Sequence, residues 1–265
     1  MPKIEEHQPA SLGDLLRIVE EYQSGRKFVW YRGVTNADFA LIPSIARSSS
    51  IKDEGDVDAL EKEIYATFCQ RSPPFVDRDL IGPWKNLFFM QHYGVPTRLL
   101  DWSESPFVSL YFALSGVKRT EDGHPTSDVA LWLCDPVEWN RTALSHITFR
   151  GEILHEGSEQ IKAYSPEIHI DHKATQPIMI YGVHNSARIV AQRGVFALFG
   201  KSMKGMEQVF TSTEFPKRSL EKIVIPKELI DTLLNSLYQK GFSESTIYPD
   251  LMGLSLEIRR KFGFQ

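Results

Sequence analysis

The segment 105–116, SPFVSLYFALSG, constrains the fold more than any other part of the chain. Ser105 followed by Pro106 is typical of a helix start, with serine as the N-cap and proline in the first turn. The residues that follow are apolar on nearly every side of this helix, so it is expected to pass through the centre of the molecule. At about a dozen residues it is too short to cross a bilayer. Other apolar elements must therefore surround it.

Several apolar stretches are predicted to be strands of a central sheet. They occupy residues 27–33, 128–134, 177–183 and 220–226, and a short capped helix turns at Gly194 into one more. Further helices are expected at residues 11–25, 58–72, 83–94, 226–241 and 251–262. Because strands and helices do not alternate as βαβ units, the fold class is α+β, a single domain with a mixed or antiparallel core sheet surrounded by helices. The polar segment 135–176 is left without an assigned element.

The composition is that of an ordinary globular protein, with 42% hydrophobic and 24% charged residues. Cys69 and Cys134 lie far apart in apolar surroundings, which favours a reduced, cytoplasmic protein. The first residues contain acids and prolines instead of the basic start and apolar run of a signal peptide, and no membrane association is expected. The net charge of −4 means that any nucleic-acid contact requires a local basic groove.

Three polar clusters interrupt the core-like sequence, each at the end of an expected element. The first contains Tyr31, Arg32 and Gly33, the second contains Gln91, His92, Tyr93, Thr97, Arg98, Asp101 and Ser103, and the third contains Arg188, Gln192 and Arg193. Taken singly, these residues have structural explanations, since Arg32 or Arg98 can form an ion pair with Asp101. Taken together, two or three arginines facing one pocket would repel each other unless an anionic ligand or buried acids balanced them, and an anionic small molecule is the more economical partner. With Tyr31, Tyr93 and Trp102 available for stacking, the clusters indicate a site for a nucleotide-like small molecule.

Other kinds of site have weaker support. His169 and His172 are three residues apart, but no third ligand stands at a diagnostic spacing, so no metal is expected. Neither cysteine has a neighbouring base that would make it a nucleophile. A metal-dependent hydrolase using Asp101 and His92 ranks last, because paired carboxylates are missing from the sequence.

Four stretches resemble the FRG-domain family, named after its Phe-Arg-Gly or Tyr-Arg-Gly motif. They are WYRGV, QHYGVPTRLLDWSESPFVSLYFAL, RIVAQRGVFALFG and GFSESTIYPDLMGLS, and Tyr31, Arg32 and Gly33 match the name. The resemblance covers residues 25–255, with residues 1–24 as an N-terminal helix of the same unit and 256–265 as the end of the C-terminal helix. It implies a bacterial or phage protein associated with toxin or antiviral-defence systems, with an antitoxin or another defence protein as a partner.

The order of motifs is also similar to that of ADP-ribosyltransferases, which implies an ADP-ribosyltransferase-like fold and NAD as cofactor. On this resemblance the catalytic residues are Arg32, His92, Asp101 and Gln192, and the cofactor-binding residues are Tyr31, Arg32, Gly33, Tyr93, Thr97, Arg98 and Arg188. Gln192 falls nearest the position of the family's catalytic glutamate but carries no charge, so Asp101 or Glu207 would have to supply it. The implied function is transfer of ADP-ribose to a macromolecule, protein or nucleic acid. The alternative is a non-catalytic module that binds a nucleotide or nucleic acid and signals through a partner protein.

Overall fold

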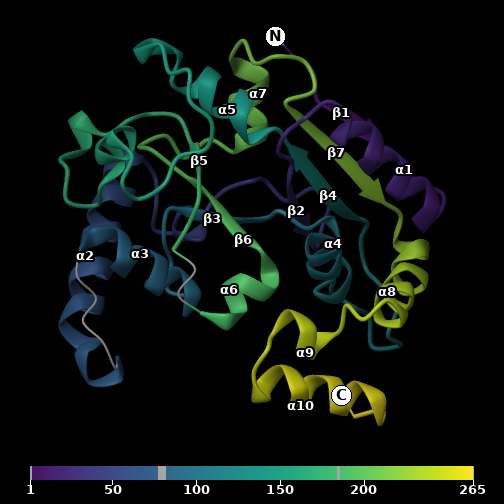
Figure 1. Cartoon of the computed structure of the whole chain (residues 1–265). Coiled ribbons are helices and arrows are strands. Elements are labelled where there is room, and N and C mark those ends of the chain that lie inside the picture. The colour runs from purple at the N-terminus through teal and green to yellow at the C-terminus, as the bar shows by residue number, and fades with distance from the viewer. Residues whose placement is uncertain (1, 77–81, 184–185, 265) are drawn as a thin grey trace.

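A single seven-stranded sheet forms the centre of the molecule in the computed structural model, which describes residues 2–76, 82–183 and 186–264 (Figure 1). The strands are β1 Glu5–His7, β2 Trp30–Val34, β3 Leu99–Ser103, β4 Val129–Cys134, β5 Ile178–Ile180, β6 Gly194–Leu198 and β7 Leu220–Ile225. They lie in the order β1-β7-β4-β2-β3-β6-β5. β1 runs parallel to β7, and all the other neighbouring pairs are antiparallel. The predicted α+β single domain is confirmed, and its sheet is mixed.

Helices cover both faces of this sheet. They are α1 Leu12–Gln23, α2 Glu54–Arg71, α3 Pro83–His92, α4 Pro106–Ser115, α5 Pro136–Ala143, α6 Ala187–Gln192, α7 Met206–Ser212, α8 Ile230–Gln239, α9 Glu244–Ile247 and α10 Leu251–Lys261. α1, α4 and α8 share one apolar cluster with one face, and α3, α5 and α7 share another with the opposite face. α9 and α10 lie together at the end of the molecule that carries the C-terminus (Figure 1). Among the described residues, no helix combines the length and the apolar character that a bilayer span requires.

The expectation for the apolar helix is confirmed by α4. Its N-cap Ser105 accepts a hydrogen bond from the Val108 amide, and Pro106 stands in its first turn. Val108, Leu110 and Leu114 are all buried. α4 packs against both β2 and α8, so it lies within the core as its sequence predicts.

Gly33 lets α4 lie directly on β2. A Cβ atom at this position would be 1.9 Å from the main-chain oxygen of Ser109 and 2.9 Å from the nitrogen of Ala113. The Ser109 hydroxyl also donates a hydrogen bond to the Tyr31 carbonyl at 2.9 Å, which ties the helix to the strand. Close packing therefore requires glycine at this position.

The structure corrects several sequence predictions. β2 extends to Val34, so Arg32 lies in the middle of the strand and not at its end. β3 was not predicted, because its centre carries the exposed Asp101 and its extended form depends on pairing with β6. β1 was missed because it has only three residues and is held by β7. The unassigned segment 135–176 contains α5 and three 3-10 turns, Ser145–Ile147, Glu159–Tyr164 and Ile170–His172.

A buried ion network fixes that segment to the rest of the fold. The Arg98 Nε atom donates to the Glu61 carboxylate at 2.6 Å, and the other guanidinium nitrogens donate to two main-chain carbonyl groups at 2.5 and 2.6 Å. The Lys173 ammonium lies 2.9 Å from Glu61 and 2.6 Å from Asp58. Although burial opposes ionisation of Asp58, the Lys173 and Lys62 ammonium groups outweigh it and lower its pKa. The network joins α2, the start of β3 and the end of the segment 135–176.

The two edge strands of the sheet are short. β1 and β5 have three residues each, whereas β7, the neighbour of β1, has six. Beyond β5, Leu154 forms an isolated parallel bridge with Ile180. Little unpaired strand is therefore left at either edge.

We expect Gly33→Ala to lower the free energy of unfolding by about 3 kcal/mol, because the added methyl group forces α4 away from β2. Gly13→Ala is the matched control, since a Cβ there meets only the Ser11 hydroxyl at 3.8 Å. In the first turn of α1 this substitution should stabilise the fold by up to about 1 kcal/mol. Urea unfolding measures both, and equal stabilities of the two variants would contradict the packing constraint.

Glu61→Gln should destabilise the protein by about 3 kcal/mol, because it leaves two buried cations facing one buried carboxylate. Glu63→Gln, on the exposed side of the same helix, should change the free energy of unfolding by less than about 0.5 kcal/mol. Thermal and urea unfolding of both variants test this. If the two variants lost similar amounts of unfolding free energy, the buried ion network would make no specific contribution to stability.

Candidate functional site

The central sheet separates between β2 and β3. β2 pairs with β4 over five residues and β3 pairs with β6 over five, but β2 and β3 share the single pair Tyr31 and Ser103. A cavity of about 410 Å³ opens beside this joint. Its lining includes seven of the predicted site residues, namely Tyr31, Arg32, Gly33, His92, Asp101, Arg188 and Gln192.

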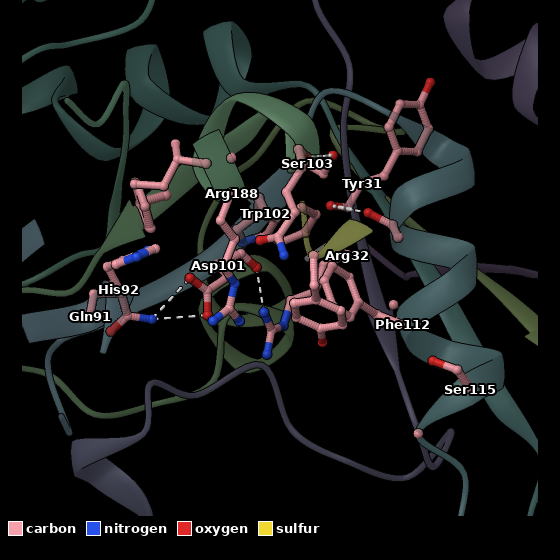
Figure 2. Close-up of a pocket in the computed structure, with 18 of the residues that line it drawn as sticks. Tyr31, Arg32, Gln91, His92, Asp101, Trp102, Ser103, Phe112, Ser115 and Arg188 are labelled. Atoms are coloured by element: carbon pink, nitrogen blue, oxygen red, sulfur yellow. Dashed lines mark hydrogen bonds between the residues drawn. The ribbon is translucent and has the colours of Figure 1, made fainter. Parts of the chain in front are cut away.

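Arg32 is the central cation of the cavity. One guanidinium nitrogen donates to the main-chain carbonyl of Asp101, which links β2 and β3 where the ladder is missing (Figure 2). The Nε atom is buried and has no hydrogen-bond partner within residues 2–76, 82–183 and 186–264. Burial lowers the pKa of Arg32 to about 10, although the Asp101 carboxylate opposes the shift. The guanidinium is therefore charged at neutral pH and incompletely satisfied by the described residues.

Asp101 supplies the negative charge of the cavity wall. Both oxygens of its carboxylate accept hydrogen bonds from the Gln91 side-chain nitrogen at 2.9 Å (Figure 2). The Gln91 oxygen accepts a hydrogen bond from the Thr97 hydroxyl at 2.5 Å. This chain orients the Gln91 amide so that its nitrogen faces the carboxylate. Asp101 is the one carboxylate among the described residues that line the cavity.

His92 and Arg188 form the side of the cavity near α6. Burial lowers the pKa of His92, and the neighbouring Arg188 lowers it further, so the imidazole is neutral at pH 7. Its Nδ1 atom lies 3.4 Å from the Ser186 hydroxyl. The Arg188 guanidinium lies over the Tyr248 ring, with 4.9 Å between its central carbon and the ring centroid.

A second hollow of about 680 Å³ adjoins the cavity. It shares Gln91, His92, Asp101 and Arg188 with the cavity, and Tyr93 and Asp250 are on its wall. The neutral imidazole and the carboxylate thus face two neighbouring spaces. Two ligands, or two parts of one ligand, can approach them together.

Gln192 lines the cavity and also holds its wall in place. Its side-chain nitrogen donates to the Ile247 carbonyl at 3.1 Å, which ties α6 to α9. Its main-chain carbonyl accepts a hydrogen bond from the Ser103 hydroxyl at 2.7 Å. Glu207, the other residue considered as a source of charge, is outside the cavity lining and accepts a hydrogen bond from the Leu41 amide. Of the two carboxylates considered, Asp101 is the one in the cavity.

Some predicted cofactor-binding residues lie elsewhere. Arg98 is buried in the ion network with its guanidinium fully engaged, and Thr97 is buried behind Gln91. The Tyr31 ring points away from the Arg32 guanidinium, and its hydroxyl accepts a hydrogen bond from Gln23 (Figure 2). Tyr93 is exposed and lines the second hollow rather than the cavity. Arg98, predicted to bind the cofactor, is thus outside the cavity lining, whereas Arg32 and Arg188 are part of it.

The structure adds residues that the sequence prediction left out. Gln91 was named only as part of a polar cluster, yet it holds Asp101, and the aromatic rings of Phe112 and Tyr248 complete the lining. The sequence feature that could have indicated a role for Gln91 in the site is its position next to His92 at the end of a predicted helix. Tyr248 stands in the last of the four stretches that resemble the family.

One group of side chains in the described part of the chain has the geometry of metal ligands. It consists of Glu5, His7 and Glu221, on β1 and β7, and none of them lines the cavity. Glu221 is also 2.5 Å from the Arg218 guanidinium and 2.9 Å from His7. These contacts balance the buried carboxylate by ion pairing and explain the group without a metal.

The comparison with protein families finds the FRG domain over residues 27–122. A search of curated proteins gives no match, and a search of solved structures gives none either. The matched segment contains β2, α3, β3 and α4, and with them Arg32, Gln91, His92 and Asp101. The two strands on either side of the separation in the sheet thus lie within the segment that matches the FRG domain.

Proposed function

We propose that the cavity binds NAD and that the protein transfers ADP-ribose from it to a macromolecule. The observation that carries this proposal is Arg32, a charged guanidinium inside the fold whose Nε has no partner among the described residues. The phosphate oxygens of a pyrophosphate can accept two hydrogen bonds from the planar guanidinium, which is the bidentate contact that arginine prefers. Arg188 adds a second positive charge on the same cavity. Together these charges favour a ligand with two negative phosphates.

The side chains around Arg32 fit the chemistry of glycosidic transfer. The reaction breaks the bond between the ribose C1′ and the nicotinamide nitrogen, and nicotinamide leaves with the electron pair. Asp101, fixed by Gln91, can stabilise the positive charge that develops on the ribose or accept a hydrogen bond from a ribose hydroxyl. The neutral His92 can take the proton of the acceptor atom that bonds to C1′. In this proposal Asp101 supplies the negative charge that a glutamate provides in ADP-ribosyltransferases and that Gln192 lacks.

The acceptor is proposed to enter through the second hollow, because His92 and Asp101 face both spaces. In this arrangement NAD occupies the cavity beside β2 and β3, and the protein or nucleic acid that accepts ADP-ribose occupies the second hollow. The family resemblance suggests that such a protein acts in the cytoplasm as a toxin or defence effector, with a neutralising or defence-system partner. The alternative, a binding module that signals through a partner protein, uses the same arginines and has no turnover.

We expect calorimetry to show NAD binding that weakens at least tenfold in Arg32→Met, because the charge-assisted contact to phosphate is lost. Arg17→Met, in an exposed pair on α1, is the control and should bind as the wild type does. Absence of NAD binding in the wild type, together with no nicotinamide release in the presence of cell lysate, would reject the transferase.

Asp101→Asn should keep NAD affinity within about threefold but lower nicotinamide release by about 100-fold, since a preorganised charge at the reacting centre is worth that factor. Release is followed by chromatography of the products. Binding without any release in the wild type would instead support the non-catalytic module.

Without ligand, Arg32→Met should leave the free energy of unfolding unchanged or raise it by about 1 kcal/mol, because burial disfavours a cation that no side-chain carboxylate pairs. Arg98→Met is the matched control, and it should cost about 3 kcal/mol because Glu61 loses a partner. Denaturant unfolding compares the two. Equal losses would show that Arg32 is a structural arginine.

A further inference from the structure

α10 has a wide apolar surface in contact with solvent. Of the twelve large hydrophobic side chains that are exposed in the described part of the chain, seven lie within residues 251–264. They are Leu251, Met252, Leu254, Leu256, Ile258, Phe262 and Phe264. With ~100 Å² of apolar surface on each, they form a patch of several hundred Å², at or above the upper end of what monomeric proteins leave uncovered.

The most regular part of this patch is a row along the helix. Leu251, Leu254, Ile258 and Phe262 are spaced by three, four and four residues, so they share one face. We call these four residues the α10 stripe. The spacing matches the positions by which one helix packs against another.

The opposite face of α10 is already packed. Gly253 is buried against α9 and Tyr248, where an added Cβ would be 1.9 Å from the Tyr248 carbonyl. The Arg260 guanidinium pairs with Glu244 at 2.8 Å, and the Glu257 carboxylate accepts hydrogen bonds from the hydroxyls of Ser243 and Ser245. α10 is therefore held firmly on α9 with its stripe turned outward.

We propose that two copies of the chain dimerise by antiparallel pairing of their α10 stripes. A standard interface takes ~800 Å² from each partner. The α10 stripe supplies roughly half of this area, and the exposed Met252, Leu256 and Phe264 beside it supply most of the rest. Because a two-fold axis places the same surface on both partners, a surface with a regular stripe can pair with itself.

The charges on α10 favour the antiparallel direction. Its last turn carries Arg259, Arg260 and Lys261, and its N-cap is the carboxylate of Asp250. Arg260 is engaged by Glu244 on the packed face, so the preference for one direction depends on Lys261: antiparallel pairing brings Lys261 of each copy toward Asp250 of the other, whereas parallel pairing brings the two Lys261 side chains together. The two-fold axis then lies near Ser255, which is exposed at the middle of the helix.

Dimerisation would also brace the cavity. Tyr248, which lines it, lies in the short connection between α9 and α10, and the Ile247 carbonyl holds the Gln192 side chain. The pairing itself does not depend on any ligand, so its test is separate from that of NAD binding.

Sedimentation velocity of the full chain at about 10 μM should show a dimer, which Ile258→Glu converts to monomer by raising the dissociation constant at least 100-fold. Ile147→Glu is the matched control, because Ile147 is similarly exposed on another part of the surface, and this variant should remain dimeric. A monomeric wild type, or a dimer that survives Ile258→Glu, overturns the proposal.

A cross-linking measurement tests whether the middle of α10 meets its own copy in the dimer. In a Cys69→Ser background, Ser255→Cys should form a covalent dimer under mild copper-catalysed oxidation, and Asn235→Cys, exposed on α8, should not. A monomer that instead co-sediments with phosphatidylglycerol vesicles would identify the α10 stripe as a lipid-binding surface and overturn the dimer. Equal cross-linking of both cysteine variants would also overturn it.

Discussion

The close contact between α4 and β2 at Gly33 is the constraint on which the rest of the structure depends. It brings the Ser109 hydroxyl to the Tyr31 carbonyl, and Tyr31 is the residue of β2 that pairs with β3. The helix therefore supports the sheet at the one point where its two halves meet. Beyond that point the strands separate, and the space between them becomes the cavity. A packing requirement of one glycine thus positions the arginine beside it.

Two arginines of this fold illustrate opposite ways of keeping a cation inside a protein. Arg98 has a carboxylate and two carbonyl groups around it, so its charge is balanced and serves the structure. Arg32 has one carbonyl, its Nε has no hydrogen-bond partner in the described part of the chain, and burial lowers its pKa by more than the Asp101 carboxylate raises it. Both arginines lie in motifs that resemble the family, so the difference between them comes from the groups that surround each side chain. The residues next to each arginine in the sequence do not distinguish the two. What distinguishes them is Glu61 of α2, which pairs with Arg98 and is distant in the sequence.

Much of the fold could be predicted from periodicity and end signals, which located α1, α3, α4, α8 and α10. β3 could not, because its alternation is broken by Asp101 and only its partner strands make it extended. At the site, the sequence indicated Arg32, His92, Asp101, Arg188 and Gln192, all of which line one cavity. It could not show that the Tyr31 ring is directed elsewhere, since this depends on which side of β2 faces the opening. Nor could it show that Thr97 lies behind Gln91, since this depends on how the connection from α3 to β3 folds back on the helix.

The short strand β1 also determines how much of β7 is left open to pairing with a strand of another chain. β7 is six residues long and mostly buried, and three residues of β1 pair along it. An uncovered strand of this type is a template for cross-β growth, in which identical segments stack without limit. Residues Glu5–His7 thus occupy the edge of β7 at which a strand of another chain could otherwise pair.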